Sequence, residues 1–234
     1  AWKYGERAFR YCQHDAGHAI GALAVAAAGL GWEARLIEGI PDRELAELLG
    51  VRNQRGPEAE QPECLLVAAP PVRGLSLEER AAFELPASVL AGLASARWNG
   101  TPNRLSKDHH PWPVIDEVAL ATEQTGARSW EPFSFDNSSL SAGDALLSLR
   151  RIIQQRRSAV ALDGSTGISR DAFFQILLKA MPGANQVPFI ALPWRPRIDL
   201  LLFVHRVDGV EPGLYALLRD PSREQALRAA LDVP

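Results

Sequence analysis

The residues near the start of the chain offer proton-transfer chemistry at the mouth of an apolar helix. Lys3 and Tyr4 lead into a charged and aromatic run that reaches Cys12, and a stretch composed mainly of Ala and Gly follows at 19–30. An amine or a phenol acts as a general base once its pKa is lowered, so Lys3 and Tyr4 are catalytic candidates. The alternative is a surface lysine beside a tyrosine that packs under the helix.

A second set of candidates, Arg156, Arg157 and Ser158, follows a predicted helix. Guanidinium groups bind phosphate through paired hydrogen bonds, so this triplet is suited to a phosphorylated ligand. The alternative is that the two arginines complement the negative end of the preceding helix. The residues alone favour that alternative.

Histidines occur in two places, and neither predicts a metal site. His14 and His18 are four residues apart and, with Asp15, resemble part of a helical metal site. No glutamate lies between the two histidines and no third ligand is evident, so we expect no metal. His109 and His110 lie in a proline-rich stretch, where we expect a solvated pair.

Helices and short strands must position these residues. Apolar positions recur at helical spacing from Arg7 to Leu30, and Gly29 with Gly31 predicts the end of this helix. Gly17 and Gly21 share one of its faces, which predicts a buried central helix. The other expected helices are 43–49, 114–125, 141–155, 170–180 and 222–231, and Ser141 and Ser169 are the expected N-caps of the third and fourth of these. The expected strands are 32–37 and 64–69, together with 200–207 and 214–218, which form a hairpin. Separate helical and strand blocks indicate an α+β fold.

Composition narrows the classes of function. The formal net charge of −3 gives no reason to expect nucleic acid or an anionic membrane as a partner. Cys12 and Cys64 lack the spacing of a metal or redox motif, so we expect reduced, buried thiols. The apolar run 19–30 is too short to span a bilayer, and no secretory signal precedes it. These observations predict a cytoplasmic protein.

Three segments resemble the nitroreductase-like flavoprotein superfamily, and specifically its SagB-type (thiazoline or oxazoline) dehydrogenase branch. The first is Lys3–Arg7 with Asp15–His18, and the second is Leu36–Gly39 leading into 43–51. The third is Gln155–Ser158 with Asp163, followed by the hairpin Val204–Tyr215. The stretch 103–117 is also similar to this branch, so the resemblance covers most of the chain.

The resemblance implies a nitroreductase-like fold, in which helices flank an antiparallel-dominated sheet and a long apolar helix is central. It also implies FMN as cofactor. The resemblance implies that the ribityl chain and phosphate lie against Arg156, Arg157 and Ser158. It also implies that the turn at Glu38 and Gly39 passes beside the reactive edge of the isoalloxazine ring, where glycine allows the backbone to approach closely. An ordinary strand-to-helix turn is the alternative for Glu38 and Gly39. In this branch a Lys-Tyr pair is implicated in catalysis, which Lys3 and Tyr4 match.

The function implied is that of an FMN-dependent oxidoreductase, most like an azoline dehydrogenase acting on a modified peptide. Two alternatives stay open. One is a degenerate, non-catalytic module that binds a peptide or a partner enzyme, and the other is a general NAD(P)H-dependent nitroreductase acting on a small molecule. Superfamily members are commonly dimers, so we expect a homodimer or an internal pseudo-dimer.

The order of the pieces differs from that of a single superfamily domain, because the late pieces come first. A tandem duplication explains this order: 1–97 is the C-terminal half of one unit, 98–140 is a linker with a helix, and 141–234 is the N-terminal half of a second unit. A circular permutation is the alternative. Val160 replaces an often basic residue, and Leu192–Arg197 replaces a loop of small residues, so the second flavin site departs from the pattern.

Overall fold

The computed structural model describes residues 4–56, 58–74, 79, 85–126, 148–183, 186–195 and 197–231. The chain divides into two units, Ala1–Trp130 and Glu131–Pro234. This division falls within the segment 98–140, for which the sequence predicts a linker. Lys3 and Ser141 lie outside the described residues.

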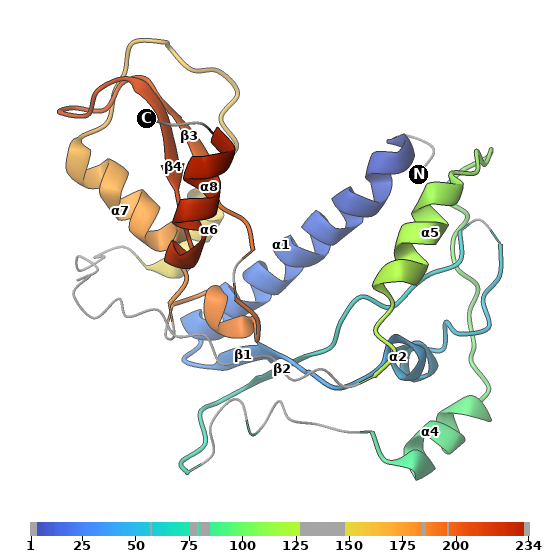
Figure 1. Ribbon diagram of the computed structural model, residues 1–234. Coiled ribbons are helices and arrows are strands. Elements are labelled where there is room, and N and C mark those ends of the chain that lie inside the picture. Colours follow the sequence, from blue (N-terminus) through green and yellow to red (C-terminus); the bar gives the residue numbers. More distant parts are fainter. Residues whose placement is uncertain are drawn as a thin grey trace. The chain divides into compact units, whose positions relative to one another are not determined.

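A long helix and a two-stranded sheet form the first part of unit one (Figure 1). A 3-10 turn, Gly5–Arg7, leads into α1 (Ala8–Gly29), and the chain reverses at Gly31 with φ +70°. β1 (Glu33–Leu36) pairs antiparallel with β2 (Leu66–Ala69), and α1 packs on both strands. The predicted helix 7–30 and the strands 32–37 and 64–69 are therefore confirmed.

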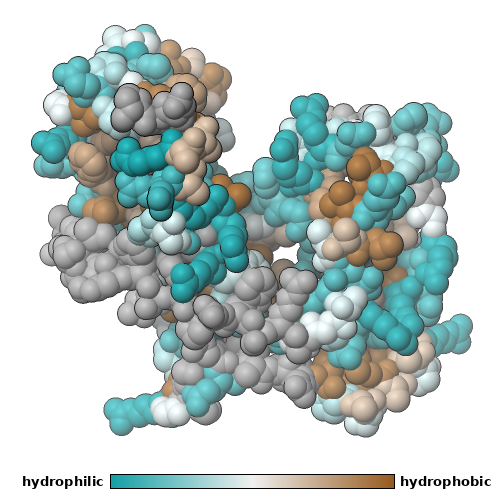
Figure 2. All heavy atoms as spheres, viewed as in Figure 1, coloured by the Kyte–Doolittle hydropathy of each residue, from teal (hydrophilic) through white to brown (hydrophobic). Residues whose placement is uncertain are grey.

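Three shorter helices complete the described part of unit one: α2 (Asp42–Leu49), α4 (Ala87–Ala94) and α5 (Pro113–Thr122). The predicted helices 43–49 and 114–125 correspond to α2 and α5. α4 is not predicted from the sequence, because its run of small and apolar residues shows no polar face. Apolar side chains gather at the surface over α5 (Figure 2), where Leu120 is 73% exposed.

The prediction that α1 is buried on its glycine face is wrong for this chain. Only Ala8, Ala24 and Ala27 of α1 are buried, and Leu23 is 38% exposed. A β-carbon on Gly17 would meet no described atom within 4 Å. No described helix packs against this face, where Gly17 is exposed and Gly21 is half-buried.

The described part of the second unit contains a hairpin and three α-helices. They are α6 (Leu149–Gln155), α7 (Arg170–Ala180) and α8 (Glu224–Leu231). β3 (Leu200–Val204) pairs antiparallel with β4 (Gly213–Leu217), which confirms the predicted hairpin. Two 3-10 turns, Phe189–Ala191 and Pro221–Arg223, complete the described elements.

Serine caps begin two of these helices. The Ser169 hydroxyl accepts a hydrogen bond from the backbone N–H of Ala172 at 3.3 Å, as predicted for α7. At α6 the capping hydroxyl belongs to Ser148, which accepts from the N–H of Arg151 at 3.2 Å. The sequence predicts an earlier start for this helix at Ser141, within the part of the chain that is not described.

Both cysteines are free thiols, as predicted. The expected burial is wrong for Cys12, which is exposed because this part of α1 faces solvent. Cys64 is half-buried, and burial together with nearby Glu63 raises the pKa of its thiol. None of the helices in the described ranges has the length and apolar character needed to cross a membrane.

Candidate functional site

Tyr4 lies at the entrance to α1, where its ring packs on the helix. The rings of Tyr4 and Tyr11 meet edge to face with their centroids 5.0 Å apart. Tyr11 also contacts the imidazole of His14, at a centroid distance of 6.3 Å. Tyr4 is nevertheless 46% exposed. The phenol therefore belongs to an ordered aromatic group and is still accessible to a ligand.

A second segment packs on the same turn. Trp112 immediately precedes α5, and its ring covers Gly5 so closely that a β-carbon there would lie 3.3 Å from Cζ2. Gly5 has φ +61°, a conformation that glycine adopts at little cost. His110 contacts the Trp112 ring edge to face, with centroids 4.9 Å apart. Residues from two distant parts of the sequence thus surround the Tyr4–Gly5 turn.

Trp112 also carries an unsatisfied donor. Its indole Nε1 is buried, and it has no hydrogen-bond partner among the described residues. A buried N–H without an acceptor is costly, so such groups are often completed by a water or a ligand. We call Tyr4, Tyr11, His14, His110 and Trp112 the aromatic cluster. Within this cluster, the Tyr4 hydroxyl is the group that can transfer a proton.

Only part of the aromatic cluster is predictable from the sequence. Tyr4 is a predicted catalytic residue, whereas His110 is predicted to be solvated and no role is predicted for Tyr11 or Trp112. His110 is exposed, as expected, yet it also contacts an indole ring. The Trp112-Pro113 pair marks the start of α5, since proline favours the first turn of a helix. No local signal indicates that the Trp112 ring packs on Gly5.

The second pair of candidates, Glu38 and Gly39, forms a turn that connects β1 to α2. The Glu38 carboxylate lies 3.5 Å from the guanidinium Nη2 of Arg35, and both side chains are largely shielded from solvent. Gly39 has φ +89°. This geometry is that of a strand-to-helix turn, which is one of the two interpretations from the sequence. A flavin contact at Gly39 stays a prediction.

Arg156, Arg157 and Ser158 lie in the second unit, in an exposed segment directly after α6. One nitrogen of Arg157, Nη1, donates to the backbone carbonyls of Gln154 and Arg156, both at 2.8 Å. These contacts satisfy carbonyls at the C-terminal end of α6, which is the alternative that the residues alone favour. Binding of a flavin phosphate by the triplet stays a prediction.

The histidines of α1 do not belong to a metal cluster. His18 Nδ1 lies 3.9 Å from Asp15 Oδ1, and both side chains are exposed. Across the described ranges, no three His, Cys, Asp or Glu side chains come together in a way that could hold a metal ion.

Comparison with known proteins finds a similarity in the first part of the chain. Residues 1–68 match the Nitroreductase family. No curated protein and no solved structure matches the chain. The matched segment contains Tyr4, α1, β1, the Glu38–Gly39 turn and α2. This match supports a relationship to the nitroreductase-like superfamily and points to a flavin-dependent oxidoreductase, because members of that family typically bind FMN.

The residues within and beside the Nitroreductase match fit the ring system of a flavin. The aromatic cluster offers accessible ring surface, and the buried Nε1 of Trp112 is a donor without a described acceptor. The oxygens and ring nitrogens of a flavin are acceptors of this kind. The mixture of helices and small antiparallel sheets is also compatible with the α+β class.

Asp163 lies outside the Nitroreductase match, and its role in the structure is to order a turn. Its carboxylate accepts hydrogen bonds from the backbone N–H groups of Ser165 at 2.9 Å and Thr166 at 2.8 Å, and from the Thr166 hydroxyl. These bonds favour the charged form and lower the pKa of Asp163 to about 2. The turn continues to Ile168, whose backbone bonds to Arg206 and Asp208 beyond β3.

The titration of Asp163 gives a direct check on this turn. An unfolded Asp has a pKa of about 3.9. Because the pKa is lower in the folded state, the charged carboxylate stabilises the turn fully when the pH is above the unfolded pKa. This contribution is lost as the pH falls through the folded pKa of about 2. Carbon-detected NMR should show the Asp163 carboxyl titrating near pH 2. In the variant Thr166→Val the pH midpoint of the Asp163 titration should rise, because the carboxylate loses the Thr166 hydroxyl as a donor. An unchanged midpoint would contradict the role of Asp163 in ordering this turn.

Proposed function

We propose that the chain is part of an FMN-dependent oxidoreductase, most like an azoline dehydrogenase that oxidises a thiazoline or oxazoline in a modified peptide. The observation that supports this proposal most is the Nitroreductase match over residues 1–68, which includes the Lys-Tyr pair at the entrance to α1. Bound FMN supplies a two-electron acceptor. The protein must supply binding, orientation and a base.

The base is assigned to Tyr4 or Lys3. Aromatising an azoline ring removes one proton from a ring carbon together with a hydride equivalent, so a group beside the substrate must accept the proton. Tyr4 suits this role because Tyr11 orients its ring and its surface stays accessible. Trp112 fixes the adjacent Gly5, and its free indole N–H can donate to an acceptor on the flavin ring.

The phosphate of FMN is assigned to Arg156, Arg157 and Ser158. Arg157 would exchange its hydrogen bonds to the carbonyls of Gln154 and Arg156 for phosphate oxygens. Arg–phosphate pairs are often bidentate, which adds energy and geometric specificity that single bonds to carbonyls lack. Arg156 makes no hydrogen bond through its side chain to a described residue, and its guanidinium is available for the same ligand.

An FMN titration of the purified protein tests the cofactor proposal. We expect the visible absorbance of FMN to shift and its fluorescence to change on binding. The double variant Arg156→Ala/Arg157→Ala should weaken FMN binding by about 30-fold, because hydrogen bonds to charged groups contribute about 1.5–3 kcal/mol each and part of this is recovered from water. Riboflavin, which lacks the phosphate, should bind both proteins equally. Absence of any flavin binding would refute the proposal.

A non-catalytic module is the main alternative, and one group of observations favours it. Val160 is fully exposed, and Arg157 is engaged with the carbonyls at the end of α6. Such a module would bind peptide without flavin and without turnover. A general nitroreductase would be distinguished by its electron donor. NADPH would then reduce the bound flavin even when no azoline is present.

Assembly through apolar faces is also proposed, as a homodimer or an internal pseudo-dimer. The small-residue face of α1 is exposed, and on one face of the β3–β4 hairpin Leu201, Phe203 and Leu214 are 60%, 74% and 64% exposed. Apolar surface of this kind is usually covered by a partner. Light scattering coupled to gel filtration would distinguish a dimer from a monomer.

A further inference from the structure

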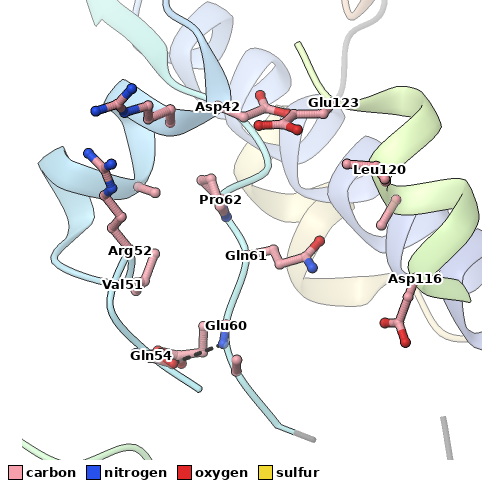
Figure 3. Close-up of a pocket in the computed structure, with 14 residues that line it drawn as sticks. Asp42, Val51, Arg52, Gln54, Glu60, Gln61, Pro62, Asp116, Leu120 and Glu123 are labelled. Carbon is pink, nitrogen blue, oxygen red and sulfur yellow. Dashed lines mark hydrogen bonds between the residues drawn. The ribbon is translucent and has the colours of Figure 1, made fainter. Parts of the chain in front are cut away.

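A cavity of about 480 Å³ lies within the first unit, between α2, the stretches 51–54 and 59–62, and α5 (Figure 3). Figure 3 shows Gln61 projecting toward α5, which carries Asp116 and Leu120 and is followed by Glu123. Ala46, Val51, Pro62 and Leu120 supply apolar surface. The volume is in the range of binding sites for small ligands or single peptide side chains.

The charges around this cavity leave an excess of carboxylates. Asp42, Glu60, Asp116 and Glu123 line it, together with Arg43 and Arg52. Arg52 is already paired with Glu47, which does not line the cavity. Asp116 and Glu123 form no ion pair and no side-chain hydrogen bond with any described residue. Two uncompensated carboxylates beside apolar surface favour a cation with an aliphatic stem.

A second cavity, of about 430 Å³, adjoins the first, because Gln54 and Ala59 line both. Its only described carboxylate, Glu58, is bound by the backbone N–H groups of Leu105 and Ser106 at 2.8 and 2.7 Å. Arg55 and Arg104 also line it, so this end of the groove is basic. We call the two cavities together the groove. Because they share Gln54 and Ala59 and differ in charge, an extended chain fits them better than a compact molecule.

We propose that this groove binds an extended peptide segment that carries a lysine or an arginine. The cationic head lies at Asp116 and Glu123, and the aliphatic stem lies on Val51 and Leu120. The peptide backbone continues along Gln54 and Ala59 toward the basic end. This assignment uses none of the residues proposed for the flavin, so it stands whether or not FMN binds.

Fluorescence anisotropy with a labelled Gly-Ser-Ala-Lys-Ala-Ser-Gly peptide tests the proposal, alongside matched peptides with Gln or Glu in place of Lys. The Lys peptide should bind most tightly, and its affinity should fall as salt is added. The double variant Asp116→Asn/Glu123→Gln should weaken binding of the Lys peptide about fivefold, as expected for two partly exposed charge pairs. Binding of the Gln peptide should be unchanged by this variant.

Glu117→Gln is the matched control, because Glu117 lies on the same helix and does not line the cavity. This variant should bind the Lys peptide as the unmodified protein does. Circular dichroism would verify that all variants are folded. The proposal would be overturned if the Glu peptide bound as tightly as the Lys peptide, or if no peptide bound. It would also be overturned if Glu117→Gln weakened binding of the Lys peptide as much as the double variant does. Binding of lysine amide as tight as that of the peptide would also overturn it, in favour of a small-molecule site.

Discussion

Replacing Tyr4 by phenylalanine should lower the rate of azoline oxidation by about 100-fold, while FMN affinity stays unchanged. The substitution removes the oxygen that we propose accepts the proton, as a phenolate, but keeps the ring that meets Tyr11 at 5.0 Å. The aromatic cluster therefore keeps its packing and loses only its acid–base group. Single-turnover reduction of the bound flavin by an azoline peptide would measure the rate of the chemical step.

Tyr11→Phe is the control for this prediction, because it also removes one phenolic hydroxyl from the aromatic cluster and keeps the ring contact. Its rate should remain within about threefold of the original, since its hydroxyl is not the proposed proton acceptor and its ring contacts are kept. Lys3→Met separates the two candidate bases. A full rate in Tyr4→Phe with a large loss in Lys3→Met would assign the base to Lys3, and full rates in both would exclude the pair.

The elements around this site are largely readable from the sequence, because they depend on local patterns. The helical spacing of small residues and the Gly29–Gly31 stop predict α1, and Pro41 with Asp42 predicts the start of α2. The Ser169 cap of α7 is likewise predicted, since one hydroxyl bonds to a backbone group three residues away. Such interactions lie within a single turn and leave a signature in neighbouring residues.

Contacts between distant segments have no such signature. Trp112 covers Gly5, and Glu58 binds the backbone of Leu105 and Ser106, yet neither contact follows from residue types or spacing. α4 was missed for a related reason. Its uniform apolar composition gives no period, and its position is set by packing on α2. The cavity beside α5 depends on three such segments, so it too was not predicted.

Gly50 is a further position where a distant contact matters. It ends α2 with φ +70°, and a β-carbon there would lie 2.2 Å from Cδ2 of Trp98. Gly50→Ala should therefore lower the free energy of unfolding by about 2–4 kcal/mol. Roughly 1 kcal/mol arises from the left-handed backbone, and the remainder from displacing the indole or moving the helix end. Urea denaturation followed by circular dichroism would measure the change.

Gly31→Ala isolates the backbone term of the Gly50 prediction. Gly31 has the same φ of +70° just beyond the end of α1, but a β-carbon there meets no described atom within 4 Å. Its cost should be about 1 kcal/mol, so the difference between the two alanine variants measures the clash with Trp98. In a Trp98→Ala background the cost of Gly50→Ala should fall to that of Gly31→Ala. If Gly50→Ala and Gly31→Ala lower the free energy of unfolding equally in the protein that keeps Trp98, the indole moves away freely and does not fix the end of α2.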